Sequence, residues 1–153
     1  MKITLISIGK FDNANFKELF NNYLKRIAWK INLIEIDSKI SNAVDKNKIL
    51  EIEGDLLIKN FDKYQKIIIL DPLGQHMDSV KFSNIIKKFS IDGFSNIAFV
   101  IGGAYGLSEK VKNRGDLILS LSQMTLPHLM VRLFMIEQLY RAYTIINNHP
   151  YHK

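Results

Sequence analysis

The sequence contains no cysteine among its 153 residues. This absence excludes disulfide bonds, thiolate zinc sites and a cysteine nucleophile, and it fits a reducing compartment, so we expect a cytoplasmic protein. Long apolar runs are also missing, because no apolar stretch reaches the length that spans a membrane. The N-terminal segment MKITLISIGKF lacks the cleavage site of a signal peptide, and we interpret it as a strand.

Linkers and an excess of acidic residues are missing as well. No Pro/Ser-rich segment, internal repeat or change of composition divides the chain, so we expect a single domain over residues 1–153. Lys and Arg number 21 against 15 Asp and Glu, which gives a net charge of +6. A positive excess suits a polyanionic partner such as nucleic acid, although ordinary surface lysine gives the same balance.

What the sequence does contain is an alternation of short β-rich runs with helical patterns. We expect strands over residues 2–8, 31–36, 66–70, 96–101 and 117–121, and helices over 15–28, 45–61, 79–91, 107–115 and 127–147. The segment Asp71-Pro72-Leu73-Gly74 is interpreted as a turn that ends the third strand. Strands that alternate with helices predict an α/β fold, with a mainly parallel sheet and helices on both faces.

Two of the expected strands each deliver a loop to one edge of this sheet. The strand 96–101 ends at Gly102 and Gly103, with Gly106 close behind, and the strand 117–121 leads into the uncharged segment 122–126. Ligands of open α/β sheets bind at the carboxyl ends of the strands. The glycines match neither G-x-G-x-x-G nor a G-K-[ST] phosphate loop, which argues against a dinucleotide or ATP site. They either form a binding loop for a flat apolar ligand or simply make a tight turn.

The last expected helix, 127–147, is more apolar than one buried stripe requires, which predicts a second subunit on its other side. His128 and Arg132 share one face of this helix, and Glu137 and Arg141 share another, where they form either a functional pair or an ordinary exposed salt bridge. The tail 148–153 combines aromatic and basic side chains, which suits stacking on a nucleotide base. Two tail histidines without a third ligand are a weak metal signal, so we expect no metal.

Three segments carry a family resemblance: FVIGGAYGLS, LSLSQMTLPHLMVRLFMIEQLYRAY and NHPYHK. Together they resemble the RlmH family of SPOUT-class methyltransferases, and the resemblance extends over the whole chain. It implies an α/β fold whose C-terminal part forms a trefoil knot, and a homodimer built through the last helix. It also implies methylation, with S-adenosylmethionine as cofactor, of the N(3) ring nitrogen of a pseudouridine in 23S large-subunit ribosomal RNA, on the assembled ribosome.

The resemblance also implies roles for individual positions. The S-adenosylmethionine contacts fall on Leu70, Gly102, Leu121, Ser122, Gln123, Met124, Thr125 and Leu126. The candidate catalytic residues are His128, Glu137, Arg141 and His152, and the candidate RNA contacts are Arg132 and Tyr151. A ring nitrogen must lose its proton before it attacks a methyl group, so a base or a cation is needed. The sequence leaves open whether His128, His152 or Glu137 is the base, and which arginine is the cation.

Two other functions remain open at this point. The protein is alternatively a non-catalytic factor that binds or assembles the ribosome, or a SPOUT methyltransferase that acts on tRNA. The intact glycine loop and the LSQMTL segment argue against the first alternative. No appended RNA-binding domain is recognised, which favours a large preformed substrate such as the ribosome over free tRNA.

Overall fold

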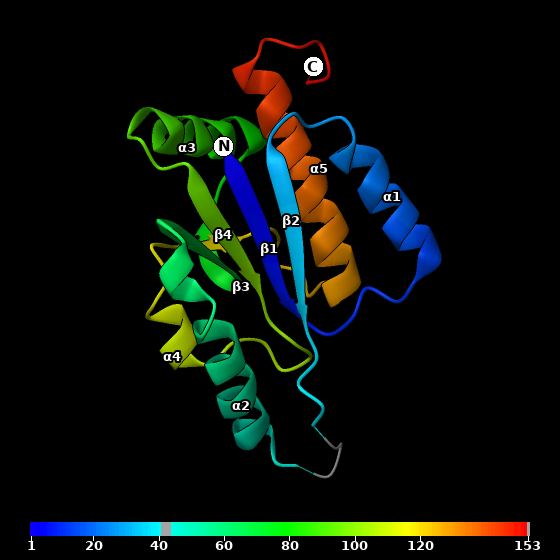
Figure 1. Ribbon diagram of the computed structural model, residues 1–153, viewed down its shortest axis with the longest axis vertical. Helices are drawn as coiled ribbons and strands as arrows, with labels where there is room; N and C mark the ends of the chain where they lie inside the picture. Colours follow the sequence, from blue (N-terminus) through cyan, green and yellow to red (C-terminus); the bar gives the residue numbers. More distant parts are fainter. Residues whose placement is uncertain (41–43, 153) are drawn as a thin grey trace.

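The computed structural model describes residues 1–40 and 44–152, and its centre is a five-stranded sheet (Figure 1). The strands are β1 (Lys2–Ile8), β2 (Lys30–Ile36), β3 (Lys66–His76), β4 (Asn96–Ile101) and β5 (Leu117–Ser120). They lie in the order β2-β1-β4-β3-β5, and each described pairing is parallel. The predicted parallel sheet is therefore confirmed.

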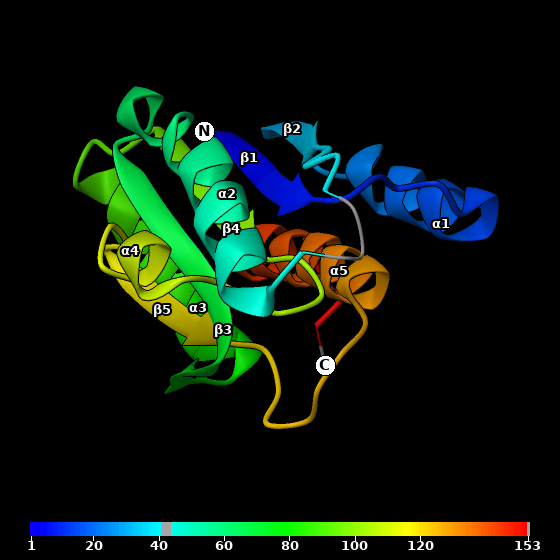
Figure 2. The same cartoon turned by 90° about the horizontal axis from the view of Figure 1, so that it is seen from below.

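Helices cover both faces of the sheet, as predicted (Figures 1 and 2). They are α1 (Ala14–Leu24), α2 (Lys46–Ile58), α3 (Ser79–Ile91), α4 (Glu109–Lys112) and α5 (His128–Ile146), with a 3-10 turn, η1, at Phe61–Lys63. One core joins the sheet to α1, α3 and α5 through residues such as Phe20, Phe82 and Leu139. A second core on the opposite face joins it to α2 and α4 through Leu57 and Val111.

The central strands are buried on both faces, which explains their nearly continuous apolar sequence. The side chains of β1 from Ile3 to Ile8 are at most 5% exposed, and those of β4 from Ile97 to Ile101 are at most 3% exposed. Strands that have helices on both sides need apolar residues at successive positions, not at alternate ones. Helices α2 and α3 begin at polar caps: Asp45 accepts from the backbone N–H of Asn47, and Asp78 accepts from that of Lys81.

The predicted turn at 71–74 is wrong, because β3 continues through it to His76. Leu119 of β5 lies opposite both Leu70 and Gln75, so the four residues between these two bulge out of the ladder. A bulge accepts Pro72, which has no N–H to donate. At Gly74 a Cβ atom would lie 2.7 Å from the backbone carbonyl of Ile118, so only glycine lets the two strands approach this closely.

Helix α5 begins one residue after the predicted start, with Pro127 as its cap. It packs between α1 and α3, and this position uses much of the apolar surface that predicted a second subunit. Ile136, for example, is fully buried in the chain's own core. Met130 and Phe134 remain 45% and 43% exposed on the same helix. Across the described residues, no helix has the length and apolar character needed to cross a bilayer.

Candidate active site

A cavity of about 740 Å³ opens at the carboxyl edge of β3, β4 and β5. This is the edge at which the sequence predicted a ligand site. The lining comes from the ends of these three strands and from the first turn of α5: residues 70–73, 101–107, Lys112, Leu121, Ser122, 124–128 and Val131. Seven of the eight predicted cofactor contacts therefore line one cavity, whereas Gln123 is exposed outside it.

The glycine loop forms one wall of this cavity. A Cβ atom on Gly102 would lie 2.5 Å from the carbonyl oxygen of Gly106, and Gly106 itself has a φ of +83°. Gly103 and Gly106 face each other in an isolated antiparallel bridge. The close backbone packing that requires glycine here also shapes the cavity. The glycine loop is therefore both a tight turn and a wall of the cavity.

The segment 121–126 forms another wall of the cavity. The Ser120 hydroxyl donates to the carbonyl oxygen of Ser122 at 3.1 Å, and the Ser122 hydroxyl accepts the backbone N–H of Met124 at 2.9 Å. These local bonds hold the loop in a defined turn. The side chain of Met124 is 77% exposed, whereas Leu121 packs against the core. The loop is therefore held by the two serines and by this apolar contact.

His128 and Arg132, which the sequence placed on one face of the last helix, have different environments. His128 lines the cavity, and burial lowers its pKa, an effect that the neighbouring Arg132 cation increases. The imidazole is therefore held toward its neutral form, which can accept a proton.

Arg132 is fully buried and ties α5 to the ends of β1 and β2. Its guanidinium donates to the carbonyl oxygens of Ile8 at 2.9 Å and Gly9 at 2.8 Å, and to a carboxylate oxygen of Glu35 at 3.1 Å. The same carboxylate oxygen accepts the backbone N–H of Phe11. The prediction that Arg132 contacts RNA is corrected by this placement, because none of its side-chain surface is exposed.

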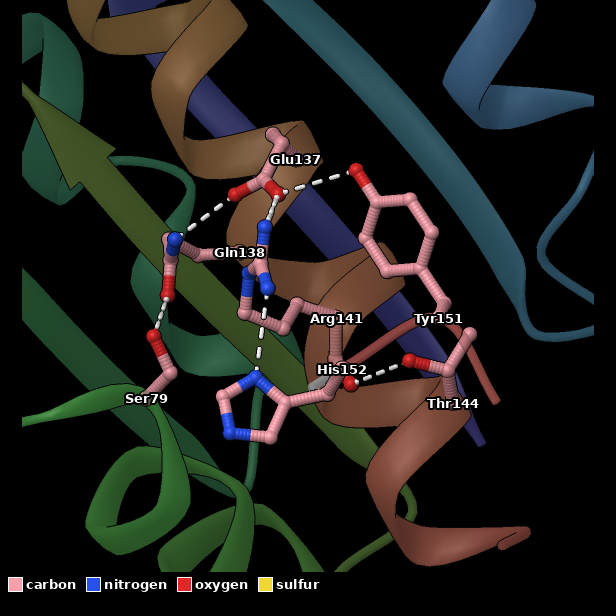
Figure 3. A network of polar contacts seen from close by, with 7 residues as sticks. All are labelled: Ser79, Glu137, Gln138, Arg141, Thr144, Tyr151 and His152. Carbon is pink, nitrogen blue, oxygen red and sulfur yellow. Dashed lines mark hydrogen bonds and ion pairs between the residues drawn. The ribbon is translucent and has the colours of Figure 1, made fainter. Parts of the chain in front are cut away.

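The other predicted residues form a second polar group, the tail cluster, which consists of Glu137, Arg141, Tyr151 and His152 (Figure 3). One oxygen of Glu137 accepts from Arg141 Nε at 3.0 Å, from Arg141 Nη2 at 2.5 Å and from the Tyr151 hydroxyl at 3.2 Å. Arg141 Nη1 lies 3.2 Å from His152 Nδ1. Arginine has no acceptor, so Nδ1 must be the accepting nitrogen of this imidazole.

Aromatic contacts hold the tail against its own helix. The Tyr151 ring lies 4.6 Å from the Tyr140 ring, and the Arg141 guanidinium lies 4.9 Å from the Tyr151 ring. Burial raises the pKa of Tyr151 to about 12, so its phenol stays protonated and donates to Glu137. The bond to Glu137 raises the pKa of Arg141. The simple alternative of an exposed salt bridge does not hold, because the Glu137 and Arg141 side chains are only 17% and 26% exposed.

The other oxygen of Glu137 connects the tail cluster to α3. It accepts from the amide nitrogen of Gln138 at 2.6 Å, and the Gln138 amide oxygen accepts the Ser79 hydroxyl at 2.7 Å (Figure 3). Both carboxylate oxygens are thus satisfied within this chain. Glu137 therefore sits in a fixed, charge-assisted network.

The cavity and the tail cluster are separate in this chain. His128 lies in the first turn of α5 and Arg141 lies 13 residues later, which corresponds to about 20 Å at 1.5 Å per residue. None of the four tail-cluster residues is part of the cavity lining. The structure thus divides the predicted site residues between the two ends of one helix.

Comparisons with known proteins show the family of this chain. The family described as "Predicted SPOUT methyltransferase" matches residues 1–152. The chain belongs to the SPOUT methyltransferase family. Two relatives of this SPOUT methyltransferase, from Clostridium tetani and Halothermothrix orenii, are 44% and 42% identical to it over 100% of both chains. Each relative is named "Ribosomal RNA large subunit methyltransferase H".

Solved structures support the fold of this SPOUT methyltransferase. A protein from Bordetella pertussis, described as a methyltransferase, has a TM-score of 0.60 and 10% identity, with coverage of 93% of this chain and 95% of that one. A protein from Legionella pneumophila, described as a methyltransferase in complex with the bound cofactor SAM, has a TM-score of 0.53 and 15% identity, with coverage of 93% and 66%. The predicted α/β fold of the SPOUT type is confirmed.

Sequence reasoning missed one charged pair in the cavity of this SPOUT methyltransferase. Lys112 of α4 lies 3.0 Å from Asp71 in the bulge of β3, with 18% and 9% of their side chains exposed. The bond to Asp71 raises the pKa of Lys112. The sequence places Asp71 only in a turn, and the two residues lie far apart along the chain, so no local pattern indicates their contact. No group of three described His, Asp or Glu side chains is arranged to hold a metal ion.

Proposed function

We propose that this protein transfers a methyl group from S-adenosylmethionine to the N(3) atom of a pseudouridine in 23S ribosomal RNA. The substrate is the large subunit within the assembled ribosome, and the enzyme is a cytoplasmic homodimer. The observation that carries the proposal is the cavity between the glycine loop and the segment 121–126, in a SPOUT methyltransferase. The names of the full-length relatives support the choice of large-subunit ribosomal RNA.

The cavity has the features that S-adenosylmethionine requires. Its volume of about 740 Å³ lies in the range of pockets that enclose small molecules. Gly102 and the uncharged segment 121–126 offer backbone groups and apolar surface to the adenosine part. Asp71 and Lys112 add one charge of each sign. When bound, S-adenosylmethionine supplies a methyl group that is already electrophilic, so the chain's task is to orient the two reactants.

The acceptor nitrogen must lose its proton before it attacks. His128 is the candidate base that lines the cofactor cavity, and its lowered pKa keeps the imidazole able to accept a proton. Glu137 is occupied by Arg141 and Tyr151, which makes it a positioning group for the tail. We assign proton removal to His128, and contact with the target nucleotide to Tyr151 and His152.

These roles require two subunits. The tail cluster lies about 20 Å along α5 from its own cavity, given the rise of the helix. Met130 and Phe134 are exposed on α5 between the two groups. In a two-fold symmetric dimer formed through this surface, the tail of each subunit reaches the cavity of the other. The dimer then assembles two complete sites from two separated halves.

The test uses ribosomes from a strain that lacks the gene. Mass analysis of their 23S RNA should show one pseudouridine without its methyl group. Incubation with the purified protein and isotope-labelled S-adenosylmethionine should restore that group at N(3). A control protein with Lys87→Ala, a substitution at an unrelated exposed position, should restore the methyl group equally well. If the protein methylated tRNA but not ribosomes, the substrate would be tRNA. If the 23S RNA of the deletion strain had an unchanged mass, the protein would be a non-catalytic ribosome factor.

A further inference from the structure

A buried carboxylate lies behind the glycine loop, on α2. Glu53 is only 8% exposed. The hydroxyl of Ser38 is 3.3 Å from its Oε1 atom, which is a long hydrogen bond. Its Oε2 atom has no hydrogen-bond partner among the described residues. One oxygen of this buried carboxylate therefore has no hydrogen bond within the described residues to replace its lost contact with water.

This unpartnered oxygen faces the glycine loop. A Cβ atom on Gly103 would lie 2.6 Å from Glu53 Oε2 and 3.1 Å from Oε1. Gly103 also belongs to the lining of the cofactor cavity, whereas Glu53 does not. The carboxylate thus touches the outer side of the loop whose inner side forms the cavity wall.

A second buried polar atom without a partner lies near the other end of this loop. This atom is the hydroxyl oxygen of Ser108, which is the N-cap residue of α4. It would lie 2.6 Å from a Cβ atom on Gly54, the residue that follows Glu53, and it too lacks a hydrogen bond among the described residues. The surface between α2 and the glycine loop is consequently short of hydrogen bonds on both sides. Buried polar atoms in folded proteins are nearly always paired, so two such atoms behind one binding loop need an explanation.

The unpaired oxygen of the buried Glu53 carboxylate lowers the stability of the folded protein. Burial raises the pKa of Glu53, which shows that its charged form is disfavoured where it lies. An apolar residue of similar size would remove this cost. Residues that lower stability in this way occur mainly where function needs them.

We propose that Glu53 is a positioning residue for the cofactor site. When S-adenosylmethionine occupies the cavity, the second carboxylate oxygen accepts a backbone N–H of the glycine loop and fixes this wall in its binding conformation. The inference rests on the proposed function, because it assigns the cavity to this cofactor. Glu53 acts through Gly103 and its neighbours and does not touch the ligand.

The test separates this role from a merely structural one by measuring two properties of each variant. Glu53→Leu keeps the approximate size but removes both oxygens, so the ligand-free protein should melt at the same or a higher temperature. Its dissociation constant for S-adenosylmethionine, measured by calorimetry, should rise at least tenfold. Glu53→Gln keeps one accepting oxygen and should restore part of the affinity. The matched control is Glu51→Leu on the exposed side of α2, which should change neither property.

A double-mutant cycle tests the contact itself. Gly103→Ala places a methyl group against the Glu53 carboxylate and should weaken binding, whereas Glu53→Ala provides room for that methyl group. The loss in the double variant should be clearly smaller than the sum of the two single losses.

Two results would overturn the inference. One is normal cofactor affinity in Glu53→Leu, and the other is a strongly destabilised or unfolded Glu53→Leu protein, which would assign Glu53 to holding the fold. Failure of the wild-type protein to bind S-adenosylmethionine would instead contradict the proposed function, so the two failures are distinguishable.

Discussion

At the scale of single residues, Arg132 illustrates both the value and the limit of a sequence pattern. The four-residue spacing to His128 placed both side chains on one helical face, and Gly9 does lie beside both of them. The pattern did not reveal that Arg132 points into the fold and not into the cavity. Its partner Glu35 lies 97 positions away, and no local signal connects the two.

We expect Arg132→Met to lower the free energy of unfolding by about 3–5 kcal/mol, as found when one member of a buried ion pair is removed. The variant removes the Arg132 donor from the carbonyl oxygens of Ile8 and Gly9, and it leaves the Glu35 carboxylate without its cationic partner. Urea denaturation followed by circular dichroism measures the change. The control Arg114→Met breaks an exposed pair with Asp62 and should cost at most about 1 kcal/mol. Equal effects of the two substitutions would show that the buried contacts of Arg132 contribute little.

At the scale of elements, the sequence predicted each strand and helix that positions the site, because their hydrophobic periodicity is clear. It failed at β3, where Asp71-Pro72-Leu73-Gly74 has the composition of a turn and yet continues a strand. The deciding interaction is the close approach of Gly74 to Ile118 on β5, a contact with a later segment. Local propensity gives way here to tertiary packing.

Gly74→Ala should therefore disturb the site as well as the fold. The new methyl group would meet the Ile118 carbonyl at 2.7 Å and push β5 away, at a cost of about 1–3 kcal/mol. Because β5 leads into the segment 121–126, the affinity for S-adenosylmethionine should fall too. Thermal unfolding and calorimetry measure the two effects.

A matched substitution separates steric from conformational cost. Gly93 has a φ of +84°, and beyond its two chain neighbours no atom of the described residues lies within 4 Å of the position that a Cβ atom would take there, so Gly93→Ala strains only the backbone. It should cost about 1–2 kcal/mol and leave cofactor affinity unchanged. If Gly74→Ala also left the affinity unchanged, the bulge in β3 would have no part in shaping the cavity.

At the scale of the whole molecule, the predicted site residues of the last helix and the tail lie at the two ends of α5. The roles of these residues stay predictions, and the sequence did not predict that the tail would fold back on Glu137 and Arg141 of its own chain. It also overstated the free apolar surface of α5, because its periodicity does not reveal that α1 and α3 flank the helix. The trefoil knot implied by the family resemblance stays a prediction, as does the dimer.

Mixing two inactive variants tests the shared site. One chain carries Gly102→Val, which damages the cavity, and the other carries Tyr151→Ala with His152→Ala, which damages the tail. Each heterodimer then has one site with both lesions and one intact site, so methyl transfer to ribosomes should return to about a quarter of the wild-type rate, from half of the dimers at half activity. Each variant alone should stay inactive.

Sedimentation of every variant provides the control, since all of them should remain dimers. A stable monomer at micromolar concentration in the wild-type protein would contradict the dimer. Well-formed heterodimers without activity would show that each chain completes its own site.

The order of the sheet also bears on how the newly made chain reaches this structure. β1 is synthesised first, yet one of its two neighbours is β4, and Lys2 pairs with Asn96. The carbonyl oxygens at its end receive their donor from Arg132, which lies 124 positions after Ile8. Contacts this distant in sequence form slowly. The emerging N-terminal half therefore carries an unfinished sheet edge while translation continues, and the rim of the cavity takes shape only once α5 has left the exit tunnel.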